Sequence, residues 1–494
     1  MRTAPLGGRF GNWTTKERHV AVLTKVETGT FDPRRFKEVL GAEAWAAFSE
    51  ALDKAESTFR GRTIWNVNST GKGGGVAEML YSLLAYAMGA GVDARWLVIE
   101  GNPEFFRITK RIHNHLHGFA GDGGPLGPVE HDLYLDALQP NAEALARVVK
   151  PKDIVILHDP QTAGLVSPMK EVADIVVWRC HVGLDTPNDI ARNAWDFLDE
   201  HVKMADAHVF SRQAFVWLGL DPEKTVIVPP SIDAFSPKNQ DLQRPIVDGI
   251  LTASGLVEGG DPGLATFGRA GGQPGLVKRS AELVDGGSPL AADARIVTQV
   301  SRWDRLKDPL GVMTGFADHI ATDSDAHLVL AGPAVEAVSD DPEGAQVLEE
   351  VRTAHSQMPP VIRARIRLAA LPMGDSEENA AIVNALQRRS DVVVQKSLAE
   401  GFGLTVAEAM WKARPVVASR IGGIQDQIVD GVSGILVSDA RDLAEYGAAV
   451  TKLLANPDLA ERMGIEAMDR VRTEFLGPRH LLQYLSLLSK LMQT

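Results

Sequence analysis

The segment 397–412 constrains the fold of this chain most, because it joins a glycine turn to two glutamates in an E-x7-E frame. It reads SLAEGFGLTVAEAMWK, with an apolar run at 391–395 before it and another at 415–418 after it. This pattern predicts a strand, a glycine turn, a helix over 404–412 and a second strand. Open α/β sheets bind ligands at such strand–turn–helix units.

The turn suits a sugar joined to a phosphate. Gly401 and Gly403 let backbone N–H groups approach a ligand closely. The N-terminus of the helix that follows favours phosphate or a sugar oxygen, and Glu408 falls about one turn inside that helix. An acidic turn that caps an ordinary helix is the simpler alternative, since motif matches carry a false-positive risk. The surrounding strands favour the ligand site.

Length and composition predict two sizeable domains of an ordinary globular protein. The chain has 494 residues, of which 45% are hydrophobic and 23% charged. Its net charge of −13 argues against a broad nucleic-acid footprint. The single cysteine, Cys180, excludes an internal disulfide and suits a reducing cytosol. The N-terminus lacks a signal-peptide core, and the apolar stretch 76–92 is too short and polar for a bilayer. We therefore expect a cytoplasmic protein with no membrane or nucleic-acid partner.

Short apolar runs alternate with helical patterns from Arg62 onward. In the first half, strands are predicted at 63–68, 94–99, 153–157, 175–178, 207–210 and 225–229. After Pro229 and Pro230 break the pattern, strands are predicted again at 295–300, 327–331 and 366–369. Buried strands that alternate with helices indicate a parallel, doubly wound sheet. The fold class is therefore α/β, with two Rossmann-like domains that face a deep interdomain cleft.

Five segments follow from these patterns. The Gly-rich stretch 249–287 lacks clear periodicity, so we interpret it as linker and loop or insertion. The C-terminal leucines are spaced as on an amphipathic helix, which we expect to cross back to the first domain. The predicted segments are an N-terminal extension packed on the first domain (1–60), the N-terminal domain (61–235), the linker and insertion (236–290), the C-terminal domain (291–477) and the C-terminal helix (478–494).

Two cations follow the strand that opens the second half. Arg302 and Lys307 lie in the sequence SRWDRLKDP, where a βα loop would bring them to the cleft. Arginine can hold a diphosphate by bidentate contacts and lysine as a point charge. Arg-x4-Lys alone would more simply be a solvated basic loop. Together with the turn at 401–404 in the same half, it indicates a diphosphate site.

A glycine-rich loop, GKGGGVAE at 71–78, follows the first strand of the first half. The backbone amides of such a loop, including those of Gly74 and Gly75, can face a phosphate or a sugar. It is not a Walker A loop, because Gly73 follows Lys72 where Ser or Thr is required. Val76 also breaks the G-x-G-x-x-G pattern, so a dinucleotide oxidoreductase has weak support.

Polar residues follow two buried strands of the first half. His158, Asp159 and Gln161 come after one strand, and His181 after the next. A histidine at such a strand end can hydrogen-bond a sugar hydroxyl, although packing or capping is the alternative. Cys180 and His181 point to opposite faces as strand neighbours, which argues against a Cys–His nucleophilic pair.

The sequence gives little support for a metal site. His113 and His117 share a helix face at i, i+4, but no third ligand is evident. Asp323 and Asp325 form a D-x-D pattern that precedes a strand, at the end opposite the cleft, so we interpret it as a solvated turn. We expect no metal ligands, and Mg²⁺ is not implied by any ligand motif.

Taken together, these motifs resemble the retaining GT-B glycosyltransferases of the glycogen-synthase-like family 4. The shared pattern is the strand with its S-R-x4-K loop, the E-G-F-G turn with E-x7-E, and the Gly-rich loop of the first domain, over Arg62 to the C-terminus. Within that family the chain is most similar to trehalose synthases, and trehalose phosphorylases share much of the pattern. The supporting segments are 68–78, 98–101, 104–106, 158–161, 178–181, 299–302 and 408–412.

The resemblance implies roles for individual residues. Arg302 and Lys307 would stabilise the leaving diphosphate, Glu400 would hold hydroxyls of the transferred glucose, Glu408 would hold the ribose, and His181 would contact the glucose near its 6-hydroxyl. Retention of anomeric configuration would need no protein nucleophile, with the leaving phosphate taking the acceptor proton. Donor contacts would also come from Gly74, Gly75, Phe402, Gly403, Leu404 and Thr405, and acceptor contacts from Glu100, His158, Asp159 and Gln161.

The implied reaction forms trehalose, reversibly, from a nucleoside-diphosphate glucose and glucose. A trehalose phosphorylase that uses glucose 1-phosphate, another family-4 transferase and a sugar-nucleotide sensor remain alternatives. The expected partners are sugars and nucleotide-sugars, with no required cofactor and a homodimeric state. Two departures from the family pattern stand out: Ala399, where Arg is expected, and the long stretch 249–287.

Overall fold

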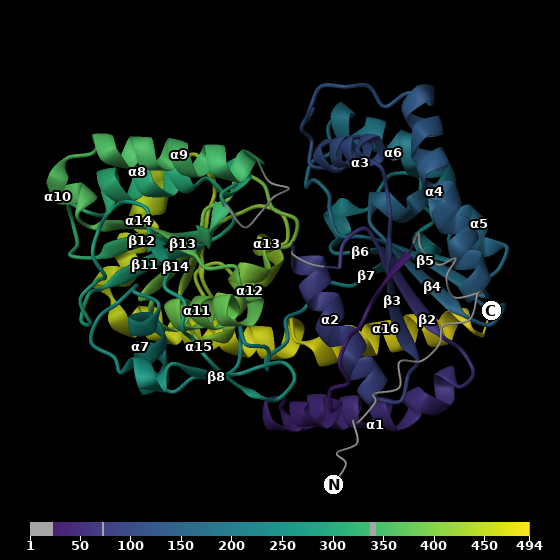
Figure 1. The fold of residues 1–494 in the computed structure, drawn as a ribbon, viewed down its shortest axis with the longest axis horizontal. Helices are drawn as coiled ribbons and strands as arrows, with labels where there is room; N and C mark the ends of the chain where they lie inside the picture. Colours follow the sequence, from purple (N-terminus) through teal and green to yellow (C-terminus); the bar gives the residue numbers. More distant parts are fainter. Residues whose placement is uncertain (1–22, 72–73, 336–341, 494) are drawn as a thin grey trace, which may run out of the picture.

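The computed structural model describes residues 23–71, 74–335 and 342–493, which form two α/β domains side by side (Figure 1). The N-terminal domain contains a seven-stranded sheet in the order β1-β3-β2-β4-β5-β6-β7. Its strands are β1 (Leu23–Val26), β2 (Ile64–Asn68), β3 (Ala94–Ile99), β4 (Ile154–His158), β5 (Ile175–Cys180), β6 (Ala207–Phe210) and β7 (Thr225–Ile227).

The C-terminal domain repeats this architecture with the order β10-β13-β12-β11-β14-β15-β16. The edge strands β1 and β10 pair antiparallel to their neighbours, and the remaining pairs in both sheets are parallel. The strands are β10 (Glu282–Leu283), β11 (Ile296–Val300), β12 (His327–Pro333), β13 (Ile366–Leu371), β14 (Val392–Gln395), β15 (Val416–Ser419) and β16 (Ile435–Val437).

Helices cover both faces of each sheet, which is why the central strands are apolar and buried along their length. The predicted doubly wound α/β class is confirmed. None of the helices in the described ranges has both the length and the apolar character of a bilayer-spanning helix. The longer helices are α1 (Ala42–Phe59), α2 (Gly74–Gly89), α3 (Pro103–Leu116), α4 (Pro128–Val148), α6 (Asp189–Val202), α7 (Arg244–Ala253), α8 (Pro309–His319), α9 (Pro342–Gln357), α11 (Ser376–Arg389), α12 (Leu404–Trp411), α14 (Leu443–Ala455), α15 (Pro457–Glu474) and α16 (Gly477–Leu491).

The Gly-rich stretch 249–287, predicted as linker and loop or insertion, contains short regular elements. It contains the end of α7, the hairpin of β8 (Thr266–Gly268) and β9 (Pro274–Leu276), and the edge strand β10. Ile250 and Leu251 of α7 are buried in one apolar cluster with Ile382 of α11, so the segment packs on the C-terminal domain. These elements are too short to show a hydrophobic period in the sequence. Burial of their apolar side chains on the C-terminal domain stabilises them.

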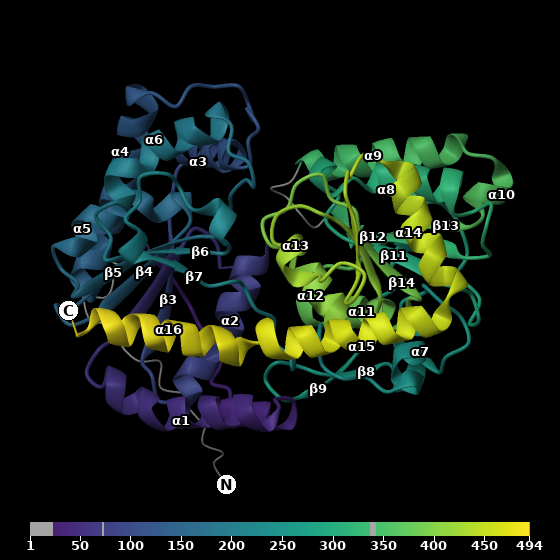
Figure 2. The same ribbon diagram turned by 180° about the vertical axis from the view of Figure 1, so that it is seen from behind.

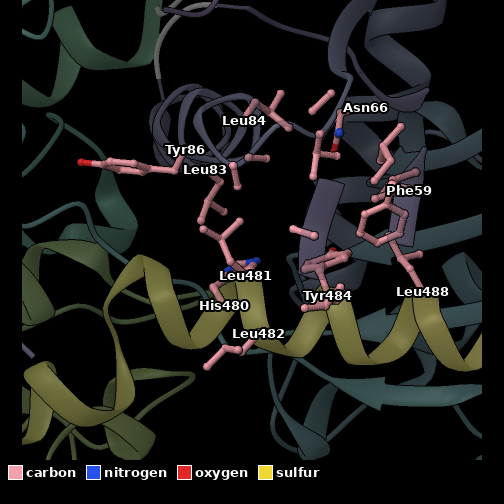
Figure 3. Close-up of a pocket in the computed structure, with 18 of the residues that line it drawn as sticks. Phe59, Asn66, Leu83, Leu84, Tyr86, His480, Leu481, Leu482, Tyr484 and Leu488 are labelled. Atoms are coloured by element: carbon pink, nitrogen blue, oxygen red, sulfur yellow. The ribbon is translucent and has the colours of Figure 1, made fainter. Parts of the chain in front are cut away.

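The last helix, α16, crosses from the C-terminal domain to the N-terminal domain, as Figure 2 shows along the back of the molecule. Its Leu487 and Leu488 are buried in a cluster with Ile64 of β2 and Ile156 of β4. Figure 3 shows a mostly apolar cavity of about 120 Å³ between α16, α1 and α2. Its lining also includes the polar residues Asn66, His158, Arg179 and His480.

Packing of α16 should contribute strongly to the stability of the N-terminal domain. Leu488 is 2% exposed, so Leu488→Ala should lower the free energy of unfolding by about 2–5 kcal/mol through lost burial and a new cavity. Urea unfolding of both proteins measures the difference. The control is Ser486→Ala on the exposed side of the same helix, which should change stability by less than about 0.5 kcal/mol. Equal effects would mean that α16 does not hold the domain.

Candidate active site

An ion pair joins two loops at the carboxyl ends of neighbouring strands in the C-terminal domain. Lys307 follows β11 and Glu400 follows β14, and these strands are parallel neighbours. Lys307 Nζ donates to Glu400 Oε2 at 2.6 Å, and the two side chains are 17% and 12% exposed. The structure thus brings together two of the residues that the sequence assigns to the donor site.

Gln299 and Lys396 support this pair; Gln299 lies in a segment that carries the family resemblance, but no role was predicted for it, and Lys396 was not singled out. The Gln299 side chain donates to the carbonyl oxygen of Lys307 at 2.8 Å and accepts from the backbone N–H of Lys396 at 3.0 Å. The Lys396 ammonium is buried and pairs with Asp308, the N-cap of α8. One buried amide therefore fixes the spacing of the two loops that carry Lys307 and Glu400.

Arg302 lies in the same loop as Lys307 but is more exposed. Its guanidinium pairs with Asp304 at 3.0 Å, and its side chain is 60% exposed. Its charge also helps to lower the pKa of His113 on α3, after the larger effects of burial, His117 and Lys110. Arg302 therefore lies on the side of this loop that faces the N-terminal domain.

The glycine turn after β14 begins α12 in the predicted manner. Gly403 adopts φ +80°, in the left-handed region that favours glycine, and is the N-cap of α12. Gly401 O accepts from Gly423 N–H at 2.8 Å, and Gly403 O accepts from Gln427 Nε2 at 3.2 Å. The carbonyl oxygens of the turn are thus paired with neighbouring groups of the C-terminal domain. The structure places Phe402, Leu404 and Thr405 in the same turn and first helical positions.

Glu408 is buried inside α12, where its carboxylate meets Lys238. Lys238 Nζ lies 3.5 Å from Glu408 Oε1 and 2.6 Å from Oε2 of Glu78 on α2. Burial opposes the lysine charge, but the two glutamates outweigh it and raise the pKa of Lys238. Burial raises the pKa of Glu408, and Lys238 partly offsets this effect. Lys238 lies in the predicted linker, so the sequence did not single it out.

In the N-terminal domain, His158 and His181 stack at the ends of β4 and β5. Their rings lie 5.6 Å apart, with His158 Nδ1 3.3 Å from His181 Nε2. Asp159 has φ +66°, and its carboxylate accepts the backbone N–H of His181 at 2.8 Å. Arg179 Nε donates to His181 Nε2 at 3.0 Å. Three of the predicted residues therefore form one connected polar group.

Burial dominates the proton affinities in this polar group. Burial raises the pKa of Asp159 to about 7, although the His181 N–H and the Arg179 charge oppose this shift. Burial and then Arg179 lower the pKa of His158 to about 3. Burial, Arg179, His158 and His480 lower the pKa of His181. Both histidines are therefore neutral hydrogen-bonding groups near pH 7.

The other predicted acceptor and loop residues are less connected to this group. Glu100 follows β3 and is exposed, and Asn141 fixes its backbone through bonds of 2.9 and 3.0 Å. Gln161 lies half-buried in the short 3-10 helix η3 (Pro160–Leu165). Gly74 begins α2 with φ +78°, whereas Lys72 and Gly73 lie outside the described residues.

The two halves of the site meet across the domain boundary. A Cβ atom on Gly401 would lie 3.2 Å from the His181 carbonyl oxygen, and one on Gly75 would lie 2.7 Å from Leu404 Cδ1. Burial lowers the pKa of His117, the C-cap of α3, to about 4; the Glu400 charge acts to raise this pKa and the Lys307 charge to lower it. The histidine pair at 113 and 117 thus faces the donor-side ion pair.

Arg212 links the two domains beside this site by an ion pair and hydrogen bonds. Arg212, which follows β6, pairs with Asp185 and donates to the Gly422 carbonyl oxygen at 2.5 Å and to Asp426 at 3.2 Å. Asp185 accepts from Gly422 N–H at 2.8 Å and from Gln425 Nε2 at 2.9 Å. These contacts hold the loop 422–426 against the N-terminal domain. The same loop hydrogen-bonds the glycine turn through Gly423 N–H and Gly401 O.

Comparison with known proteins agrees with this architecture. The family model for the trehalose synthase N-terminal domain matches residues 66–217, and that for glycosyl transferases group 1 matches residues 373–470. The trehalose synthase of Pyrococcus horikoshii is 36% identical over 92% of this chain and 95% of its own. The trehalose phosphorylase of Pleurotus pulmonarius is 27% identical over 84% of this chain and 55% of its own.

Solved structures show the same fold at lower identity. A UDP-forming α,α-trehalose-phosphate synthase from Burkholderia xenovorans superposes with a TM-score of 0.64 at 15% identity, over 88% of this chain and 100% of that one. The fold and the matched domains define a glycosyltransferase of the GT-B class. At 36% identity over nearly the whole length, the chain belongs to the trehalose synthase family.

The buried histidine at position 158 should make stability depend on pH. Because the folded-state pKa of His158 is about 3, the unfolded chain takes up a proton below about pH 6.5 and the folded chain does not. The contribution of His158 to the free energy of unfolding should therefore fall as pH decreases from about 6.5, by up to about 1.4 kcal/mol per pH unit. Urea unfolding of wild type and His158→Asn at several pH values tests this. The variant should show the smaller acid-side slope, and identical slopes would contradict the assignment.

Proposed function

We propose that this protein is a retaining glucosyltransferase that forms trehalose from a nucleoside-diphosphate glucose and glucose, reversibly. The observation that carries this proposal is the Lys307–Glu400 pair, which lies across the domain boundary from the group of His158, Asp159 and His181. A cation beside a carboxylate suits a sugar diphosphate, and neutral buried imidazoles suit uncharged hydroxyls. The membership in the trehalose synthase family supports the choice of sugars.

In the proposed reaction, the donor site handles charge that develops as the diphosphate leaves. The bond between the glucose anomeric carbon and the diphosphate oxygen breaks, and a bond to the anomeric hydroxyl oxygen of the acceptor glucose forms on the same face. The leaving phosphate takes the acceptor proton. Lys307 and Arg302 would stabilise the diphosphate charge, and Glu400 would bind hydroxyls of the transferred glucose. The apposed domains would exclude water and protect the donor from hydrolysis.

The other predicted residues are assigned to the ribose, the transferred glucose or the acceptor. Glu408 would bind the ribose hydroxyls, with Lys238 holding its carboxylate in place. His181 would contact the transferred glucose, and Asp159 with Gln161 would contact the acceptor. We further propose that the reaction requires no cofactor, and that the protein acts as a cytoplasmic homodimer on small sugars and nucleotide-sugars. The single buried cysteine supports the reducing compartment.

A trehalose phosphorylase is the second candidate, because fungal phosphorylases match most of this chain. Incubation with a panel of nucleoside-diphosphate glucoses plus glucose, and separately with glucose 1-phosphate plus glucose, distinguishes the two. We expect an α,α-linked disaccharide from a nucleotide donor. Product from glucose 1-phosphate alone would contradict the synthase, and no product from either would favour a sugar-nucleotide sensor.

Lys307→Ala should lower the rate of disaccharide formation about a few hundredfold, because one electrostatic contact to the transition state is lost.

The two glutamates of the E-x7-E frame should act on different ends of the donor. Glu408→Gln should weaken binding of the free nucleoside diphosphate by about 1–3 kcal/mol, because the ribose hydroxyls lose the buried carboxylate that accepts their hydrogen bonds. Glu400→Gln should leave that affinity nearly unchanged and lower turnover. Calorimetric titration of the diphosphate measures both. The matched control is Glu78→Gln, which removes the other carboxylate on Lys238 and should bind like wild type. Equal losses in the Glu400 and Glu408 variants would contradict the assignment.

A further inference from the structure

Three side chains with metal-ligand atoms converge away from the active site, between α4 and α6 of the N-terminal domain. His131 lies in the first turn of α4, and Glu200 and His201 lie in the last turn of α6. His131 Nε2 lies 3.0 Å from His201 Nε2 and 3.1 Å from Glu200 Oε1. His201 Nε2 lies 3.7 Å from the same Glu200 oxygen. Three potential ligand atoms therefore surround one point.

The spacing of these atoms fits a single small cation. A triangle with these sides has a circumscribed circle of about 1.9 Å radius, so a cation just off its plane would lie about 2.0–2.1 Å from all three atoms. Zinc–imidazole and zinc–carboxylate bonds have this length. A hydrogen bond between the two imidazoles accounts for one of the three distances but not for the carboxylate oxygen that approaches both rings.

We propose that His131, Glu200 and His201 bind Zn²⁺ or a similar first-row divalent cation, with water as the fourth ligand. Two imidazoles and one carboxylate form a ligand set that suits such cations. The Glu200 side chain is 69% exposed, which leaves room for a water ligand.

The bound cation would join two helices that support the acceptor side of the active site. Tyr134 on α4 lies next to His201, with ring centroids 6.5 Å apart. Its hydroxyl donates to the Pro160 carbonyl oxygen at 2.7 Å and accepts from Gly164 N–H at 2.9 Å. Pro160 and Gly164 belong to η3, the 3-10 helix that follows Asp159. The cation would therefore stabilise the helices against which this loop rests, without touching the substrates.

Titration of the chelator-treated full-length protein with Zn²⁺ tests the site. Calorimetry should detect one equivalent bound, and Co²⁺ in its place should give the visible absorption of a four-coordinate ion. Glu200→Gln should weaken Zn²⁺ binding by at least about tenfold, because loss of a ligand costs no less than loss of a supporting contact. His131→Gln should abolish the one-equivalent binding. Since Glu200 is exposed at the surface, its variant should fold like wild type.

Two controls distinguish this site from adventitious surface binding. Glu143→Gln removes an exposed carboxylate of the same α4 helix and should bind Zn²⁺ like wild type. Zn²⁺ should raise the thermal unfolding midpoint of wild type and Glu143→Gln, but not of His131→Gln. Absence of one-equivalent binding, or binding that survives in Glu200→Gln and His131→Gln but is lost in His113→Gln, would overturn the proposal. The glucosyltransfer assay is independent of this outcome.

Discussion

The buried guanidinium of Arg179 is the interaction on which the arrangement of the N-terminal domain depends. Arg179 is fully buried, and an unpaired charge in such a position costs several kcal/mol. Its N–H groups donate to His181, to the Tyr484 hydroxyl at 2.8 Å and to the Val228 carbonyl oxygen at 3.1 Å, and one lies 3.4 Å from His480 Nε2. Two of these partners belong to α16. The crossing helix α16 is therefore needed to satisfy a buried charge that donates directly to His181.

This arrangement makes the N-terminal domain dependent on residues from the end of the chain. Arg179 also holds the pKa of His158 and His181 low, after the larger effect of burial. Burial and this one cation together keep the neighbouring imidazoles neutral, and the cation connects His181 to α16. Residues of this network, His158, Arg179, His480 and Tyr484, also line the apolar cavity in Figure 3, so the apolar packing of α16 and the polar network meet there.

The fold and the meeting of Lys307 with Glu400 could be predicted because both follow from local pattern. Alternating strands and helices fix a parallel sheet, and a parallel sheet brings residues after neighbouring strands, such as Lys307 and Glu400, to one edge. Lys238 and Lys396 could not be found in this way, because their partners Glu78 and Asp308 are far away in sequence and no spacing marks the contact. The elements of the stretch 249–287 were missed because they are only two to ten residues long.

The same reasoning explains why the cluster at His131 had no sequence signal. His131 and His201 are 70 residues apart, and each lies on an ordinary amphipathic helix. The i, i+4 pair of His113 and His117 had the better local pattern, yet its nearest charged neighbours across the domain boundary belong to the donor loops. Local spacing therefore identified a histidine pair, whereas tertiary packing assembled the three-ligand group.

The ion pair between Lys307 and Glu400 bears on how the donor would be recognised. Each group is mostly buried and has the other as a close partner, so separating them without replacement would leave two poorly solvated charges. A nucleotide-sugar can replace both contacts at once, with its diphosphate at Lys307 and its hydroxyls at Glu400. A diphosphate without a sugar can pair with the Lys307 ammonium while Glu400 keeps its own contact to it, since the ammonium has three donors, but it gains nothing at the carboxylate. Under the proposed function, this pairing favours the intact donor over either of its parts.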